Sequence, residues 1–305
     1  MNKPLRIGTR DSKLALWQAN LVKDSLENLG IEAILVPTKS IGDIILDKPL
    51  YELGVTGVFT KALDVALLNG DIDLAVHSMK DMPTLLPKGL VQAAVLERGN
   101  PHDVLIHKGL DFLNNSGLVA TGSLRRQAQW LYRYPNHEIT DLRGNVQTRL
   151  QKLQDNAWDG ALFAAAGLER LSLDLQQQTV LQWMIPAPAQ GAIAVVISEK
   201  DQELAKALEQ INHRETEICT GVEREFLRTL EGGCSAPIGA LATIEGETLH
   251  FRGVLLSPDG QKRHYLTKEA PLSSHQGIGK EYAMEILQQG GDEVMREIKA
   301  QLGKS

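Results

Sequence analysis

The segment Asp73–Pro83, DLAVHSMKDMP, runs from an apolar strand into a dense polar loop that ends at a proline. Residues 74–76 form the apolar run, and in open α/β sheets ligands bind just beyond the carboxyl ends of such strands. This places four polar side chains at an expected binding edge, namely His77, Ser78, Lys80 and Asp81. The alternative is a solvated turn in which Asp81 pairs with Lys80 or caps local amides. We take Asp81 as the first candidate for the chemistry.

Strand and helix patterns alternate on both sides of this segment. Ser12 can cap a helix with a broad apolar stripe that stops at Gly30, and residues 34–36 read as the next strand. A second helical pattern covers 58–68 and closes at Gly70, and residues 90–96 form another apolar strand. This order predicts an α/β lobe.

A second α/β lobe is expected to begin near Asp103. Its predicted strands are 104–106, 118–120 and 161–163, with helices after Ser123 and Asn145. A proline-rich break follows at 186–191, and the strand 192–197 can return to the first sheet.

The last part of the chain has a different pattern of helices and strands. Residues 201–230 are helical in two segments with a break near 212–214, and three strands joined by turn signals predict a hairpin meander covered by helices at 282–289 and 292–302. We therefore expect an α/β protein of three domains, two lobes plus a smaller C-terminal α+β domain with an antiparallel sheet. The expected boundaries are 1–97 with 192–210, then 101–187, then 213–305.

Composition excludes several classes of protein. No apolar run reaches about 18 residues and no basic-then-apolar leader precedes the first strand, so we expect no membrane span, no export and a cytoplasmic location. A net charge of −6 argues against a general nucleic-acid binder. Phosphate-binding glycine motifs are absent, so ATP and NAD are not implied. His213 and Glu217 lack further ligands, so no metal is expected.

Arginines are concentrated in the second lobe. Guanidinium groups bind carboxylates and phosphates at two points, and helix starts at Ser123 and Asn145 offer further hydrogen bonds. A polyanionic small ligand would fit such a lining, although surface ion pairs along helices are the ordinary alternative. The arginines concerned are Arg125, Arg126, Arg133, Arg143 and Arg149, with Arg10 at the end of the first strand.

Two cysteines are too few for a disulfide scaffold. Cys234 follows two glycines, which let its loop approach another surface closely, and it follows the carboxyl end of a helix, which disfavours a thiolate. An ordinary thiol that anchors a group once is compatible with that setting, and a buried free cysteine is the alternative. We interpret Cys219 as a buried free cysteine.

Six motifs in order resemble the porphobilinogen deaminase (hydroxymethylbilane synthase) family over nearly the whole chain. They are Arg6–Arg10 with Leu14–Ala19, His77–Asp81, Ser123–Gln127, Leu142–Asn145, Gln190–Ala192 and Glu231–Cys234. The resemblance implies that the first two domains are periplasmic-binding-protein-like lobes with a ligand cleft between them. It also implies a transferase that joins four porphobilinogen molecules with loss of ammonia, on a covalent dipyrromethane cofactor, and releases hydroxymethylbilane.

The resemblance also implies residue roles. Asp81 is the expected catalytic carboxylate and Cys234 the covalent anchor. The cofactor is expected to contact Lys80, Asp81, Ser123, Arg125, Arg126, Arg143 and Gly144, and the substrate Arg10, Ser12, Arg143, Arg149 and Gln190. We expect a monomer that binds neither nucleic acid nor membrane.

Some positions depart from the family pattern. Residues 39–56 have little periodicity and are a candidate lid, but Gly54–Gly57 reads Gly-Val-Thr-Gly where the family commonly has a lysine, and Ile41 stands where a basic residue is usual. Ala120, Gly122 and Lys13 also differ from the usual residues. The role of a lid lysine therefore cannot be transferred to this chain.

The rival of a different class is a two-lobed solute-binding protein for an anionic ligand, which would carry an export signal and need no Cys234. Nucleic-acid binding through the arginines would need interleaved aromatic residues, which make up only 5% of the chain.

Overall fold

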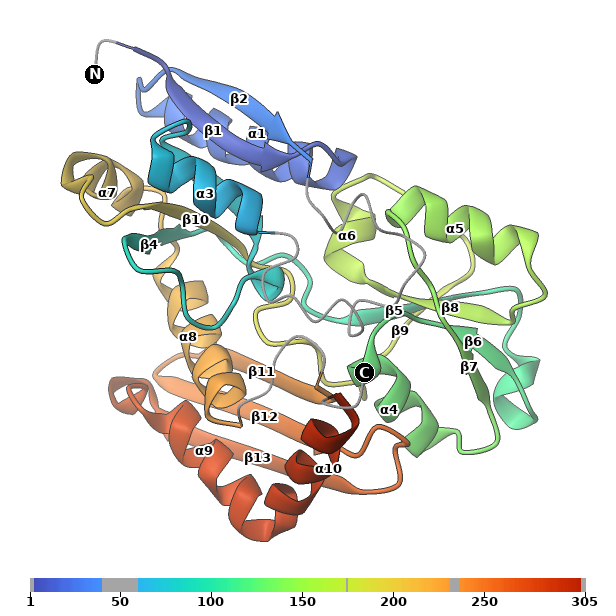
Figure 1. Ribbon diagram of the computed structural model, residues 1–305. Coiled ribbons are helices and arrows are strands. Elements are labelled where there is room, and N and C mark those ends of the chain that lie inside the picture. Colours follow the sequence, from blue (N-terminus) through green and yellow to red (C-terminus); the bar gives the residue numbers. More distant parts are fainter. Residues whose placement is uncertain (1–2, 40–59, 174, 231–235, 303–305) are drawn as a thin grey trace. The chain divides into compact units, whose positions relative to one another are not determined.

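The structure is a computed structural model that describes residues 3–39, 60–173, 175–230 and 236–302. Its described residues fall into two compact units (Figure 1). The first lies within Met1–Ile45, Val55–Gly99 and Gly191–Glu217, and the second within Asn100–Gln190 and Ile218–Ser305. The three-domain boundaries expected from the sequence, and the cleft between the lobes, stay predictions.

The first unit is built on a five-stranded mixed sheet. Its strand order is β2 (Ala33–Thr38), β1 (Leu5–Arg10), β3 (Leu74–Ser78), β10 (Ile193–Ser198) and β4 (Leu90–Val95). The first three are parallel, and β10 runs antiparallel to both of its neighbours. The predicted return of strand 192–197 to the first sheet is therefore confirmed.

Helices cover both faces of this sheet. α1 (Lys13–Asn28) and α7 (Gln202–Glu209) share one core with strand side chains, whereas α3 (Lys61–Asn69) packs on the other face, where Gly8 lies against Leu63 and Ile72. Ser12 caps α1 by accepting a hydrogen bond from the Ala15 amide at 3.3 Å, as predicted. The predicted helix start at 58 lies outside the described residues.

The second unit contains a sheet with the same layout. Its order is β7 (Glu138–Thr140), β6 (Leu118–Ala120), β8 (Gly160–Ala164), β5 (Asp103–His107) and β9 (Gln178–Val180). β6 is parallel to β7 and β8, and β5 is antiparallel to β8 and β9. Strands β7 and β9 were not predicted, because each has only three residues and no fully buried one.

Alternate residues of these strands face two different cores, as the pleat of a strand requires. Val104 and Ile106 pack with α5 (Val146–Asp155), whereas Leu105 packs with Trp130 of α4 (Leu124–Arg133). The two helices therefore lie on opposite faces of the sheet. A short helix, α6 (Ala165–Glu169), follows β8 directly, and a 3-10 turn occupies Asp111–Asn114.

The C-terminal part forms the predicted antiparallel meander. Strands β11 (Ile238–Glu245), β12 (Thr248–Leu256) and β13 (Arg263–Pro271) pair in sequence, with helices α8 (Arg214–Thr229), α9 (Ile278–Ile286) and α10 (Asp292–Leu302) beside them (Figure 1). A 3-10 turn, Leu272–Ser274, and a π-helical turn, Leu287–Gly291, complete the connections. Cys219 is buried in this core, so its interpretation as a buried free cysteine is confirmed.

Within the second unit, α4 packs against the C-terminal sheet. Ala128 shares a core with Ile185, Val254 and Leu256. The turn after β12 comes so close that a Cβ atom on Gly260 would lie 2.6 Å from the carbonyl oxygen of Ala128, and Gly260 has a φ of +75°. A glycine satisfies both requirements. The lobe and the C-terminal domain therefore share a packed interface.

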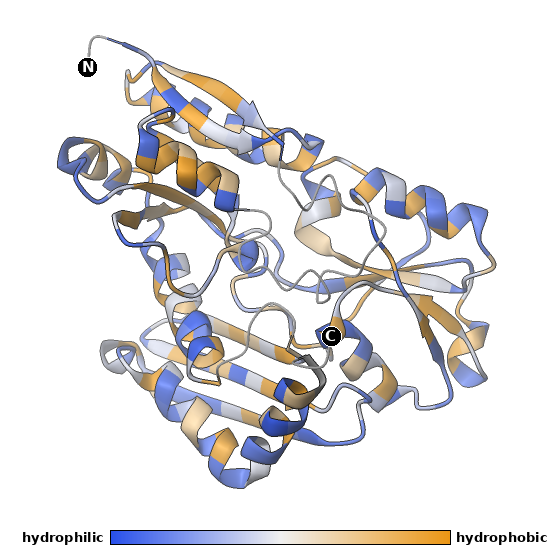
Figure 2. Cartoon of the chain, viewed as in Figure 1, coloured by the Kyte–Doolittle hydropathy of each residue, from blue (hydrophilic) through white to orange (hydrophobic). Residues whose placement is uncertain are grey.

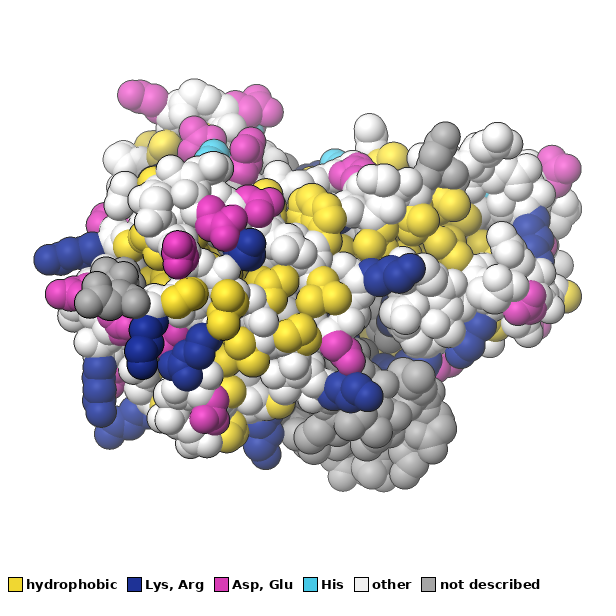
Figure 3. Space-filling model, turned by 90° about the horizontal axis from the view of Figure 1, so that it is seen from above, with side chains coloured by type: hydrophobic (Ala, Val, Ile, Leu, Met, Phe, Trp, Pro, Cys, Tyr) yellow, Lys and Arg dark blue, Asp and Glu magenta, His cyan; other side chains and the backbone are white. Residues whose placement is uncertain are grey.

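Hydropathy follows this architecture. Figure 2 shows hydrophobic residues concentrated on the strands and alternating with polar residues along the helices. On the face drawn in Figure 3, hydrophobic side chains lie among Lys, Arg, Asp and Glu. Among the helices of the described ranges, none is both long and apolar enough to cross a membrane.

Candidate functional site

The polar segment after β3 is a short ordered turn. His77 and Ser78 belong to the strand itself, and Met79–Asp81 form one 3-10 turn, so the predicted loop begins two residues later than expected. Met79 and Met82 are buried and fasten this turn to the core. The Asp81 carboxylate accepts a hydrogen bond from the Lys80 ammonium at 3.0 Å, as the solvated-turn alternative supposed, and stays partly exposed.

Several predicted site residues of the first lobe meet around this turn. Because β1 and β3 are parallel neighbours, the residues that follow them lie at the same sheet edge. A pocket of about 30 Å³ there is lined by Arg10, Ser12, Gln18, His77, Ser78 and Asp81, among others. Gln18 Nε2 donates to Ser78 Oγ at 2.8 Å, which ties α1 to the end of β3. A negative group thus stands beside hydrogen-bond donors at the edge where ligands of α/β sheets bind.

His77 is the buried member of this pocket. Burial lowers the pKa of His77 to about 4, the Asp81 carboxylate opposes the shift, and the Arg10 guanidinium adds to it. Its Nε2 atom has no hydrogen-bond partner among the described residues. At neutral pH, His77 is therefore uncharged beside Asp81.

Protonation of His77 should destabilise the first lobe in mild acid. The unfolded chain binds this proton near pH 6.5, whereas the folded chain does so only near pH 4, so the associated stability is complete above pH 6.5 and is lost as the pH falls towards 4. The loss should be about 3 kcal/mol.

Urea unfolding at pH 7 and pH 4.5, for the wild type and for His77→Gln, measures this effect. The variant should remain folded at pH 7 and show a clearly smaller decrease between the two pH values. Equal decreases in the two proteins would contradict the assignment to His77.

In the second unit, three helices start at one sheet edge. The parallel strands β6, β7 and β8 end there, and each is followed by a helix start. Ser123 caps α4 by accepting from the Arg126 amide at 3.5 Å, and Asn145 caps α5 by accepting from the Thr148 amide at 2.9 Å. Aligned helix amino termini favour anions. This edge is therefore suited to carboxylate groups.

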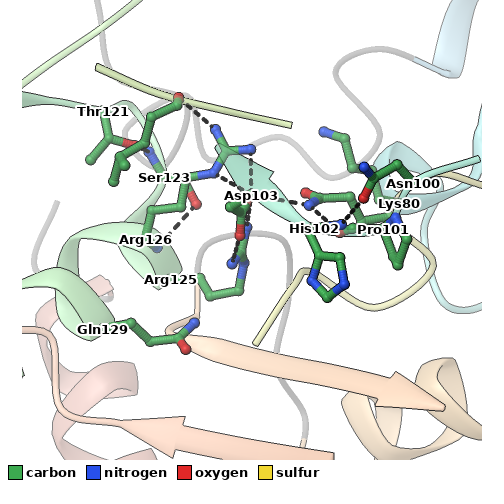
Figure 4. A network of polar contacts seen from close by, with 12 residues as sticks. Lys80, Asn100, Pro101, His102, Asp103, Thr121, Ser123, Arg125, Arg126 and Gln129 are labelled. Carbon is green, nitrogen blue, oxygen red and sulfur yellow. Dashed lines mark hydrogen bonds and ion pairs between the residues drawn. The ribbon is translucent and has the colours of Figure 1, made fainter. Parts of the chain in front are cut away.

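Arg125 and Arg126, in the first turn of α4, converge on one carboxylate at this edge. The Asp103 carboxylate is fully buried and accepts from Arg125 Nη1 at 2.6 Å, from Arg126 Nε at 2.9 Å and from Arg126 Nη2 at 2.8 Å (Figure 4). Burial alone raises the pKa of Asp103, but the two arginines and the hydrogen bonds outweigh it and lower that pKa to about 2. Asp103 is therefore ionised at any ordinary pH.

Gln190 joins the same cluster. Its amide nitrogen donates to the carbonyl oxygen of Pro101 at 2.7 Å and to Asp103 at 3.0 Å, and its side chain is buried. These two bonds give the amide nitrogen of Gln190 a structural role. The role in substrate binding expected for Gln190 stays a prediction.

The remaining predicted arginines occupy different positions. Arg143 is buried in the loop before α5, and burial lowers its pKa against the opposing effect of Asp141. Arg149 donates from Nε to the carbonyl oxygen of Gly144 at 2.7 Å. Arg133 lies at the carboxyl end of α4, where its guanidinium stacks 4.9 Å from the ring of Trp183. Arg133 is thus separated from the edge where α4 begins.

Two charged residues of the second unit were not among the predicted site residues. Asp103 was only a boundary marker, although an aspartate that opens a buried strand is itself a sign of a buried partner. Arg170 follows α6, and its burial lowers its pKa to about 10 against the opposing effect of Glu169. The sequence feature that could have pointed to Arg170 is its position a few residues after the predicted strand 161–163.

Other predicted features cannot be placed. Cys234 and residues 40–56 of the candidate lid lie outside the described residues. Within the described ranges, no group of three His, Cys, Asp or Glu side chains could hold a metal ion.

Comparison with known proteins identifies the relatives of this chain. Residues 5–206 match the family model "Porphobilinogen deaminase, dipyromethane cofactor binding domain", and residues 217–288 match "Porphobilinogen deaminase, C-terminal domain". The porphobilinogen deaminase of Pelotomaculum thermopropionicum is 42% identical over 97% of both chains, and that of Moorella thermoacetica is 43% identical over 98% of both. Among solved structures, an ancestral cationic amino acid solute binding protein, AncCDT-1, aligns with a TM-score of 0.44 at 17% identity, over 68% of this chain and 87% of that one. The two family matches together span most of the sequence, and the chain belongs to the porphobilinogen deaminase family.

Proposed function

We propose that this chain is a hydroxymethylbilane synthase, a transferase of tetrapyrrole biosynthesis. It joins four porphobilinogen molecules head to tail on a covalent dipyrromethane cofactor, with release of ammonia, and water then frees the linear tetrapyrrole. The observation that carries the proposal is the match of residues 5–206 to the cofactor-binding domain of the family. We further propose that it acts as a cytoplasmic monomer with the domain boundaries expected from the sequence, without binding nucleic acid or membrane.

Asp81 is the proposed catalytic carboxylate. When the C–N bond of the aminomethyl group breaks and ammonia leaves, a positive charge remains on the methylene carbon and pyrrole ring of the substrate. A carboxylate at the end of a strand can stabilise that charge and accept hydrogen bonds from pyrrole N–H groups. The position of Asp81 beside Arg10 and Ser12, at the sheet edge where ligands of α/β proteins bind, supports this assignment.

The edge where α4 and α5 begin is proposed to hold the acidic side chains of the cofactor and substrate. Each pyrrole brings two carboxylates, so the bound chain accumulates negative charge that arginines must balance. Arg125 and Arg126 stand together in the first turn of α4 and both bind Asp103, and Arg125 Nε has no hydrogen-bond partner among the described residues. These residues fit an anionic group such as dipyrromethane.

The remaining roles follow the family motifs. Lys80, Ser123, Arg143 and Gly144 are proposed to contact the cofactor, and Arg10, Ser12, Arg143, Arg149 and Gln190 the substrate. Cys234 is proposed to carry the cofactor through a thioether bond. When bound, the cofactor supplies the pyrrole carbon to which the first substrate is joined.

The reaction balance provides the test of the proposed function. Purified protein incubated with porphobilinogen should release four ammonia molecules for each hydroxymethylbilane formed. Ammonia and tetrapyrrole are measured in the same samples. Binding of porphobilinogen without ammonia release would contradict the proposal and favour the solute-binding alternative.

A further inference from the structure

Gln129 is a buried side chain of α4 to which the proposed function gives no role. Its carboxamide forms two hydrogen bonds with a single residue. Oε1 accepts from the Ile185 amide at 2.8 Å, and Nε2 donates to the Ile185 carbonyl oxygen at 2.9 Å. Ile185 lies between β9 and β10 and belongs to no helix or strand. The two bonds from Gln129 therefore fix the backbone of this irregular segment.

The same carbonyl oxygen binds Arg125. Arg125 and Gln129 are four residues apart on α4, so their side chains leave the helix on the same side (Figure 4). Arg125 Nη1 donates to the Ile185 carbonyl oxygen at 2.8 Å. Nη1 and Nη2 also donate to the Asp103 carboxylate, at 2.6 and 3.2 Å. Two acceptors from different parts of the chain thus set the orientation of the Arg125 guanidinium.

Strand β11 of the C-terminal sheet lies against this carbonyl as well. A Cβ atom on Gly239 would come within 2.7 Å of the Ile185 carbonyl oxygen. The next residue of the segment is bound to the same strand, because the Ala240 amide donates to the Pro186 carbonyl oxygen at 3.0 Å. The Ile185 backbone is therefore held between α4 and β11.

We propose that Gln129 is a positioning residue, which fixes the Ile185 carbonyl and thereby orients the Arg125 guanidinium for the acidic side chains of the cofactor. The inference rests on the proposed function, because that function assigns those side chains to Arg125. Arg125 Nε is buried and has no hydrogen-bond partner among the described residues, so the orientation of the guanidinium decides where this donor points. Without Gln129, the Ile185 carbonyl keeps one of these two donors and the Ile185 amide loses its acceptor.

The first test measures amide hydrogen exchange in full-length apoprotein, produced in cells that lack porphobilinogen. Gln129→Met keeps the length of the side chain but removes both hydrogen bonds. We expect the Ile185 amide to exchange at least about 10-fold faster, and the unfolding midpoint to fall by about 5 °C. Unchanged exchange at Ile185 would overturn the proposal.

The second test measures how fast the apoprotein gains the mass of two pyrrole units when it is incubated with porphobilinogen. Gln129→Met should gain this mass about 10-fold more slowly at low porphobilinogen and approach the wild-type rate at saturation, because a misplaced Arg125 weakens anion binding and leaves the chemistry intact. Gly239→Ala crowds the same carbonyl from β11 and should act in the same direction. A wild-type rate for Gln129→Met at low porphobilinogen would contradict the role of Gln129.

Two control variants separate positioning from loss of stability. Gln127→Met changes a partly exposed glutamine of the same helix that takes no part in the bonds to Ile185, and it should match the wild type in both tests. Ile298→Ala removes a buried side chain from a different core, so it should lower the unfolding midpoint at least as much without slowing the gain of mass. Equal slowing by Ile298→Ala would reduce the role of Gln129 to stability and overturn the proposal.

The remaining outcomes are also decisive. If the Gln129→Met apoprotein does not fold, Gly239→Ala takes its place in both tests. Failure of both variants to fold would overturn the inference, since the Ile185 backbone would then be a requirement for folding. A wild type that never gains the added mass would refute the proposed function, while the result of hydrogen exchange at Ile185 would be unaffected, so the two failures are distinguishable.

Discussion

Cys234→Ala will yield a protein whose intact mass equals the mass calculated from its sequence, whereas the wild type will carry the additional mass of two pyrrole units. The variant should make no tetrapyrrole at a measurable rate, because the growing chain has no anchor from which to extend. Its circular dichroism should match that of the apoprotein. Mass spectrometry of the purified proteins, with a parallel assay of ammonia release, measures both effects.

The other cysteine supplies the matched control. Cys219 is buried in the core of the C-terminal domain, so Cys219→Ala should cost about 1 kcal/mol of stability while keeping the added mass and the activity. Wild-type protein that is active at its unmodified mass would remove Cys234 from its proposed role. Loss of the added mass in Cys219→Ala alone would transfer that role to the other cysteine.

Asp81→Asn will bind porphobilinogen but turn it over about 10² to 10⁴ times more slowly, the range expected when a group that stabilises charge or moves protons is lost. The amide is nearly isosteric but carries no negative charge. KM should change much less than kcat, because the charge that Asp81 compensates develops only as ammonia leaves. Steady-state kinetics of both proteins, loaded with cofactor, give the two constants.

Asp73→Asn is the control for this experiment. Asp73 directly precedes β3, Asp81 lies in the turn that follows it, and each carboxylate pairs with a cation. Asp73→Asn should lower stability slightly and leave kcat within about twofold, as expected for loss of a partly exposed ion pair. Near-normal turnover of Asp81→Asn would show that the catalytic carboxylate lies elsewhere.

The extent to which the fold could be predicted depended on the strength of local patterns. α1 has a capping serine, a broad apolar stripe and a terminal glycine, and β10 has six apolar or small residues in sequence, so both were identified. β7 and β9 are three residues long and only partly buried, and their pairing with β6 and β5 is set by contacts distant in sequence. Such strands have no period long enough to recognise.

For the site, the segment around Asp81 was predictable because it combines a strand end with polar residues. The contacts made by the arginines of α4 were harder to predict. Arg125 and Arg126 were recognised as anion binders by motif, but no local pattern showed that they share Asp103, which precedes them by more than twenty residues. Likewise, Arg133 belongs to the same run of arginines yet lies at the other end of the helix. The spacing of arginines along the sequence therefore does not show which of them bind the same carboxylate.

The position of β10 has a consequence for folding during synthesis. The strands of the second lobe, β5 to β9, leave the ribosome as one continuous stretch and can complete their sheet. The first sheet must wait, because β10 fills the place between β3 and β4 and is translated only after that whole stretch. Until residue 198 has emerged, β3 and β4 each present an unpaired, largely apolar edge. A chain that stalls before that point displays the kind of extended segment that aggregates or is bound by chaperones, although the second lobe is already folded.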